Sequence, residues 1–161
     1  MHTTTEPETT LIAEPGRHDA TVTAIVAAPL EAVWRAYTEP ALFVRWWGPQ
    51  ELTSRVESWE PHAGGSWRIV HVDPDGNEYG FRGVYHDVVA QERITLTFEF
   101  EGVPGHVCLE THTFEAVDGG TRVTQHSVFQ AVEDRDGMLQ SGMEEHSPVA
   151  MAQLQTVARS L

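Results

Sequence analysis

Apolar and polar residues alternate through the middle of the chain, which is typical of a sheet with one covered face. The clearest case is residues 93–101, where Ile94, Leu96, Phe98 and Phe100 alternate with threonines and glutamates. Six segments of this region are rich in valine, isoleucine, threonine or aromatic residues and are separated by turn residues. They span 52–59, 66–72, 78–89, 93–101, 106–115 and 122–129. We expect them to form one antiparallel meander.

A further strand and two short helices are expected before this region. Residues 19–27 are rich in β-branched side chains and predict the strand. Pro29 then begins a helix, because a proline at the first helical position forfeits no hydrogen bond. The apolar residues of this helix recur at helical spacing, at Leu30, Val33, Trp34 and Tyr37. A second short helical segment is expected over 40–44, before a turn marked by Gly48 and Pro49.

The last segment, 133–161, predicts a long helix. Its apolar residues again recur at helical spacing, at Met143, Ala150, Leu154, Val157 and Leu161. Pro148 interrupts the pattern, so we expect either a kink there or a helix that restarts with Ser147 as its N-cap. A sheet with one apolar face and a helix able to cover it predicts a two-layer α+β domain. A sheet curled around that helix would leave a cavity between them.

The length of the chain, 161 residues, suits one domain. Residues 1–18 are polar, threonine-rich and punctuated by prolines and a glycine, so we expect a flexible tail or an edge strand there, with the domain over 19–161. All ten basic residues are arginines. The lack of lysine excludes a Schiff-base lysine, a Walker-type phosphate loop and a Ser-Lys dyad.

The net charge of −14 indicates which partners to expect. A charge this negative repels phosphate backbones and anionic lipids, so no nucleic-acid or membrane partner is expected. A lone cysteine forms no intrachain disulfide and fits a reducing compartment. The first twenty residues lack the apolar segment of a signal peptide, and no stretch is apolar for long enough to cross a membrane. We therefore expect a cytoplasmic protein, and we expect no cofactor.

A series of short motifs, in order along the chain, carries a family resemblance. They are Ala28-Pro29, Val33-Trp34, Thr38-Glu39-Pro40, Trp46-Trp47-Gly48-Pro49, Gly64-Gly65-Ser66-Trp67-Arg68, Asp75-Gly76, Gly83-Val84-Tyr85, Glu92-Arg93 and Gly119-Gly120-Thr121-Arg122-Val123-Thr124. The chain resembles the SRPBCC superfamily, and more closely the branch named after the C-terminal domain of the activator of heat-shock-protein ATPase. The resemblance covers about residues 21–161, departing from the family pattern at 146–148.

The resemblance implies a START-like helix-grip fold, similar to that of the birch-pollen allergen. In such a fold a curved antiparallel sheet wraps around a long C-terminal helix, two short helices follow the first strand, and an internal cavity lies between the layers. The same fold serves ligand binding, polyketide cyclisation or aromatisation, lipid sequestration and protein interaction, so it does not select a function.

The segment 106–115 offers the clearest candidate chemistry. Even-numbered residues share one face of this strand, and Phe114 favours that face as the inner one, as does the family habit of an apolar residue at the position of His112. Glu110 and His112 would then lie side by side in an apolar cavity, where they could act as general acid and base or orient a polar ligand. Alternatively, the pair satisfies its own hydrogen bonds, or faces solvent if the register is reversed.

Other residues are expected to line the cavity with this pair. The candidate ligand-binding set is Trp67, His71, Tyr79, Phe81, Phe98, Cys108, Glu110, His112, Gln125, Met138 and Met143. Trp67 alone of the five tryptophans is included, because the Trp46-Trp47 pair occupies a structural position in the family. No metal site is expected, since donors in line on one strand cannot surround an ion tetrahedrally.

Three functions from different classes follow. The first is binding of a small apolar or aromatic molecule in the cavity. The second is a cyclase-like or aromatase-like enzyme with Glu110 or His112 as acid or base, and with Gln125 or Tyr79 orienting a carbonyl. The third is a chaperone-linked interaction module, as the family name suggests. Pairing of sheets or helices makes a homodimer reasonable.

Overall fold

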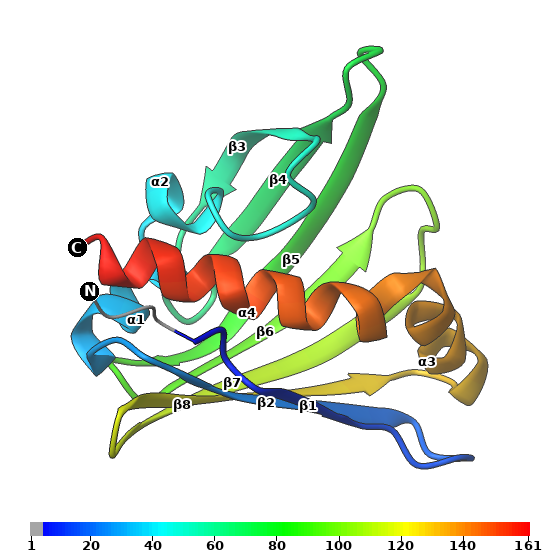
Figure 1. The fold of residues 1–161 in the computed structure, drawn as a ribbon. Helices are drawn as coiled ribbons and strands as arrows, with labels where there is room; N and C mark the ends of the chain where they lie inside the picture. Colours follow the sequence, from blue (N-terminus) through cyan, green and yellow to red (C-terminus); the bar gives the residue numbers. More distant parts are fainter. Residues whose placement is uncertain (1–4) are drawn as a thin grey trace.

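Eight antiparallel strands form one curved sheet in the computed structural model, which describes residues 5–161 (Figure 1). The strands are β1 (Thr9–Ile12), β2 (Asp19–Val26), β3 (Thr53–Trp59), β4 (Ser66–Val72), β5 (Glu78–Val89), β6 (Arg93–Phe100), β7 (Val107–Val117) and β8 (Gly120–Phe129). Their order in the sheet is β1-β2-β8-β7-β6-β5-β4-β3. The predicted six-strand meander, β3 to β8, is therefore confirmed. The strand predicted before it, β2, pairs with the last strand of the meander, β8.

The sheet bends around the long C-terminal helix, which lies across its concave face (Figure 1). Register shifts between Val56 and Ser58 in β3, and between Tyr85 and Asp87 in β5, mark irregularities where the strands can bend. The predicted inner face of β6 begins with Ile94, which is buried. The sheet and the helix together confirm the predicted helix-grip α+β fold.

The helices are α1 (Leu30–Thr38), α2 (Pro40–Phe43), α3 (Val132–Met138) and α4 (Glu144–Arg159), with a π-helical turn over Leu139–Met143 between the last two. The predicted restart of the helix at Pro148, with Ser147 as its N-cap, is wrong. The helical path is broken at Gly142, whose φ of 118° is left-handed and suits glycine. Pro148 lies inside α4, which continues through it, and Ser147 is no N-cap because it also lies inside this helix, where its hydroxyl donates to the Met143 carbonyl.

The described part of the N-terminal segment joins the sheet. Of the two alternatives, flexible tail or edge strand, residues 9–12 take the second, since they pair with β2. The side chain of Arg135 on α3 donates to the carbonyls of Glu14 and Asp19, and Gln155 on α4 donates to the carbonyl of Thr5. These bonds hold the segment because they satisfy carbonyls that the short strand leaves free. Residues 1–4 of the predicted tail lie outside the described residues.

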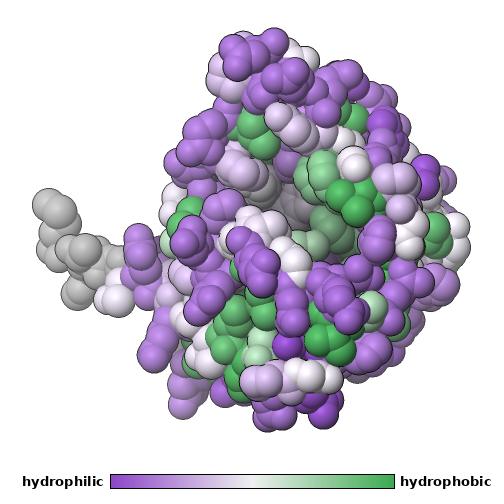
Figure 2. All heavy atoms as spheres, turned by 90° about the vertical axis from the view of Figure 1, so that its right-hand side faces the viewer, coloured by the Kyte–Doolittle hydropathy of each residue, from purple (hydrophilic) through white to green (hydrophobic). Residues whose placement is uncertain are grey.

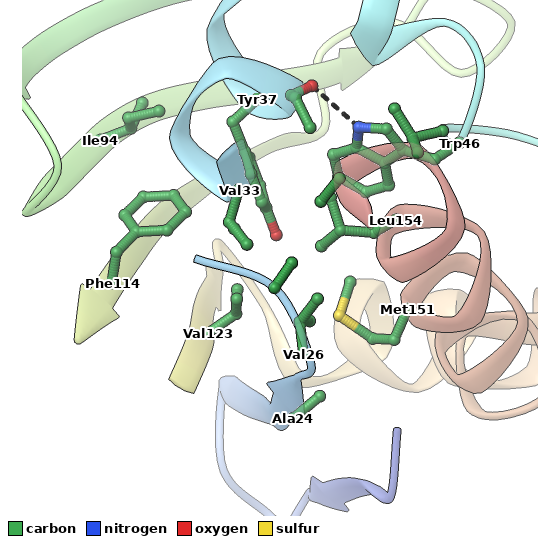
Figure 3. Packing of buried hydrophobic residues seen from close by; sticks show 14 of the residues in the cluster. Ala24, Val26, Val33, Tyr37, Trp46, Ile94, Phe114, Val123, Met151 and Leu154 are labelled. Carbon is green, nitrogen blue, oxygen red and sulfur yellow. Dashed lines mark hydrogen bonds between the residues drawn. The ribbon is translucent and has the colours of Figure 1, made fainter. Parts of the chain in front are cut away.

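The hydrophobic core lies at one end of the concave face, between α1 and the C-terminal half of α4 (Figure 3). Val26, Val33 and Leu154 are completely buried there. Trp46 enters this core with its indole N–H bonded to the Ala36 carbonyl at 2.9 Å (Figure 3). Within residues 5–161, no helix is long and apolar enough to cross a membrane.

Candidate ligand-binding cavity

A cavity of about 320 Å³ lies between the concave face of the sheet and the helices. Its size falls within the range of small-molecule sites. The wall has three parts, which are aromatic rings from α2, the turn after it and strands β3 to β6, polar residues from β7 and β8, and a rim from α3 to α4. Figure 2, viewed from the side of α3, shows the hollow with apolar atoms inside and mostly polar atoms around it.

Trp47 is the centre of the aromatic wall. Its ring stacks on Phe43 from α2 with centroids 5.3 Å apart, and it meets the edge of Phe81 from β5 at 5.4 Å. It also contacts Trp67 from β4 at 6.0 Å and the imidazole of His71 at 5.0 Å. Offset and edge-to-face contacts of this kind are the favoured arrangements of aromatic pairs. Three separate elements therefore fix the position of one ring.

The turn after Trp47 fits closely against His71. Gly48 has a φ of 90°, and a Cβ atom at this position would lie 2.6 Å from His71 Nε2. Glycine is required there for both reasons. The other imidazole nitrogen, Nδ1, forms a hydrogen bond with Ser54 Oγ at 3.0 Å. Burial lowers the pKa of His71, because desolvation disfavours the charged imidazolium.

The indole N–H groups of three tryptophans are engaged by the protein. Trp46 donates to the Ala36 carbonyl at 2.9 Å, and Trp59 to the Thr38 carbonyl at 2.7 Å. Trp67 donates across the sheet to the Thr97 carbonyl at 3.1 Å. These three residues therefore present ring surfaces to the cavity while their polar atoms face the backbone.

Four polar side chains form a block on the inner face of β7 and β8, which we call the polar quartet: Glu110, His112, Gln125 and Ser127. Glu110 lies opposite Ser127 and His112 opposite Gln125 in the antiparallel register. His112 Nε2 donates to Glu110 Oε1 at 3.0 Å, and Gln125 Nε2 donates to Ser127 Oγ at 3.2 Å. The predicted inward orientation of the even-numbered face of β7 is thus confirmed.

The quartet is largely removed from water. The side chains of His112 and Glu110 are 11% and 16% exposed. Tyr37 faces the quartet from α1, with its ring 5.6 Å from that of His112. Burial, reinforced by the negative charge of Glu110, raises the pKa of the Tyr37 hydroxyl. His112 Nδ1 is buried without a hydrogen-bond partner among the described residues.

The rim of the cavity is formed around the helical break. Met138, Met143 and His146 line the cavity there, close to Gly142. The break turns the chain from α3 into α4, so that residues from both helices reach the opening. Methionine side chains at an opening provide an adaptable apolar surface.

Most of the sequence-predicted site residues lie on the cavity wall, and two do not. The residues on the wall are Trp67, His71, Phe81, Phe98, Glu110, His112, Gln125, Met138 and Met143. Tyr79 lies outside it, on the hairpin between β4 and β5 that extends beyond the sheet, and its hydroxyl donates to Asp73 at 3.2 Å (Figure 1). Cys108 is buried but is not part of the lining, because its larger cross-strand neighbours Phe98 and Phe129 occupy the wall in that row.

Several lining residues were missed. Trp46, Trp47 and Trp59 all reach the cavity, although the sequence interpretation placed the first two in a structural role only. Ser127 was missed as well, although its spacing of two from Gln125 on one strand is a signal that could have found it. No group of three histidine, cysteine, aspartate or glutamate side chains in residues 5–161 lies close enough to hold a metal ion.

A curved sheet that grips a long helix over a lined cavity defines a helix-grip domain of the ligand-binding type. The chain belongs to the family described as Activator of Hsp90 ATPase homolog 1-like protein, whose model matches residues 27–159. This result confirms the family indicated by the sequence motifs.

Solved structures of bacterial proteins share the fold. A crystal structure from Rhodobacter sphaeroides has a TM-score of 0.85 and 26% identity, covering 94% of this chain and 99% of that one. An NMR structure from Arthrobacter aurescens has a TM-score of 0.84 and 24% identity, with 94% and 92% covered. A crystal structure from Mycobacterium smegmatis has a TM-score of 0.82 and 24% identity, with 93% and 96% covered. No curated protein matches the sequence.

Proposed function

We propose that this protein binds a small apolar or aromatic molecule in its cavity, and that it does so in the cytoplasm. The observation that carries the proposal is an aromatic wall interrupted at one place by the polar quartet. Apolar walls supply binding energy through buried area, and a few placed polar groups orient the ligand. Trp47 and Trp67 provide rigid ring surfaces, and the quartet provides the orienting groups.

The test pairs a binding screen with a variant that fills the cavity. Leu96 lines the cavity on β6, whereas Leu109 on β7 points outward and is 43% exposed. Aromatic metabolites and lipids are screened by thermal shift and native mass spectrometry against the wild type, Leu96→Trp and Leu109→Trp. Ligands that bind the wild type and Leu109→Trp but not Leu96→Trp support the proposal. A wild type that binds none of the compounds contradicts it.

A second candidate, catalysis, is favoured by the hydrogen bond between His112 and Glu110. A carboxylate and an imidazole that share a hydrogen bond in a site with little water can act together as general acid and general base. Any ligand found in the screen is incubated with the wild type and with a variant carrying both Glu110→Gln and His112→Gln, and the products are followed by mass spectrometry. We expect turnover only with the wild type. Equal turnover by both proteins would remove this pair from the reaction.

A further inference from the structure

Several hydrogen-bond donors of the cavity wall are already engaged by the protein. The indoles of Trp46, Trp59 and Trp67 donate to backbone carbonyls and the Gln125 amide donates to Ser127. The indole of Trp47 and the hydroxyls of Tyr37 and Tyr85 form no hydrogen bond with the described residues. On the rim, the hydroxyls of Ser141 and Ser147 also donate to carbonyls of their own helical segment.

Acceptors remain free at the polar quartet. Glu110 uses Oε1 to accept from His112, and its Oε2 forms no hydrogen bond with the described residues. Gln125 Oε1 is likewise without a partner in the part of the chain that the structure describes. His112 Nδ1 is fully buried, whereas Glu110 Oε2 and Gln125 Oε1 keep some exposed surface. A molecule in the cavity can therefore reach these two oxygens. The end of the cavity at β7 and β8 therefore offers two free acceptor atoms, one of them on a carboxylate.

The charged residues around the cavity disfavour an anionic ligand. Glu110 is the acidic residue of the lining in residues 5–161, and no arginine lies on that lining. The arginines of the neighbouring strands are paired elsewhere, Arg68 with Glu101 and Arg82 with Glu99. A carboxylate head group would meet no arginine on the lining, and the negative charge of Glu110 would repel it in a medium of low dielectric.

We propose, on the basis of the binding function above, that the ligand carries a hydrogen-bond donor at its buried end, a hydroxyl or a protonated amine. The donor bonds to Glu110 Oε2 with Gln125 Oε1 beside it, and the apolar body lies against the aromatic wall. The preference holds in either protonation state of His112, because Glu110 Oε2 stays an acceptor in both. Carboxylate-headed and acceptor-only molecules of the same shape bind less tightly.

Four probes with one ring system separate these head groups. Naphthol and naphthylmethylamine carry neutral and cationic donors, methoxynaphthalene is an acceptor only, and naphthoate is an anion. Dissociation constants are measured by calorimetry and by the fluorescence of the cavity tryptophans. We expect one or both donor probes to bind the wild type about tenfold or more tightly than methoxynaphthalene, and naphthoate most weakly. A preference for naphthol assigns a hydroxyl head group, and one for the amine a cationic one.

A variant of the acceptor locates the effect. In Glu110→Gln the ratio of the affinity for the amine to that for methoxynaphthalene falls about tenfold or more. Glu115→Gln is the matched control, since Glu115 lies on the outer face of the same strand and pairs with Arg122. Methoxynaphthalene or naphthoate binding as tightly as the donor probes overturns the proposal and leaves the binding function intact. Four probes that all fail to bind contradict the binding function itself.

Discussion

The space between the sheet and α4 is filled differently at the two ends of the concave face. At the packed end, α1 and the C-terminal half of α4 close on β2 and β8, and Val33 and Leu154 have no exposed surface. At the hollow end, β4 to β7 face the rim around Gly142, and about 320 Å³ stays open. One α4 helix therefore contributes to a solid core through one half and to a cavity through the other.

The difference follows from side-chain size and shape. The packed end combines small strand residues, Ala24, Val26 and Val123, with helix residues that fill the space above them (Figure 3). The hollow end is lined by large flat rings such as Trp47 and Phe81, which support one another by edge-to-face contact. We therefore expect the packed end to contribute more to stability than the hollow end.

The largest expected effect is a loss of core packing. Leu154→Ala at the packed end should lower the free energy of unfolding by about 3 kcal/mol, because it removes buried methyl groups and leaves a new cavity. Met143→Ala at the hollow end should lower it by less than about 1 kcal/mol, since that side chain borders space that is already open. Urea unfolding measures both. Equal losses would show that the two ends contribute alike.

A smaller effect separates two alanines on the same helix. Ala158 is 1% exposed in the core, so Ala158→Phe overpacks it and should cost about 1–3 kcal/mol of unfolding free energy. Ala150 lines the cavity, so the ring of Ala150→Phe has room, and the variant should keep its stability and lose ligand binding. Thermal unfolding and the naphthalene probes check the pair. An unstable Ala150→Phe would mean that the cavity is closed in solution.

The smallest effect concerns pH at the hollow end. Burial lowers the pKa of His71 in the folded protein, so the unfolded chain binds a proton there at a higher pH than the native state does. This term stabilises the protein fully above the unfolded value of about 6.5, and it is lost as pH falls from there through the folded pKa. We expect His71→Gln to flatten the decline in stability between neutral and mildly acidic pH, measured by urea unfolding. An unchanged slope would mean that His71 titrates alike in both states.

Local patterning was enough to predict much of the molecule. Alternation identified the strands and the inner face of β7, and therefore the neighbouring positions of Glu110 and His112, because successive side chains of a strand point to opposite faces. Helical spacing identified the faces of α1 and α4 that carry Val33 and Leu154. Family motifs indicated the helix-grip fold, which the family match confirmed.

Tertiary structure decided the rest, because alternation reports a face but not how deep along a strand the helices cover it. Tyr79 shares its face with Phe81 but lies past the end of the covered region, so only Phe81 reaches the cavity. Trp47 enters the wall because the turn at Gly48 brings it against β4, a contact between segments far apart in sequence. The helix breaks at Gly142, where a left-handed φ suits glycine, and continues through Pro148.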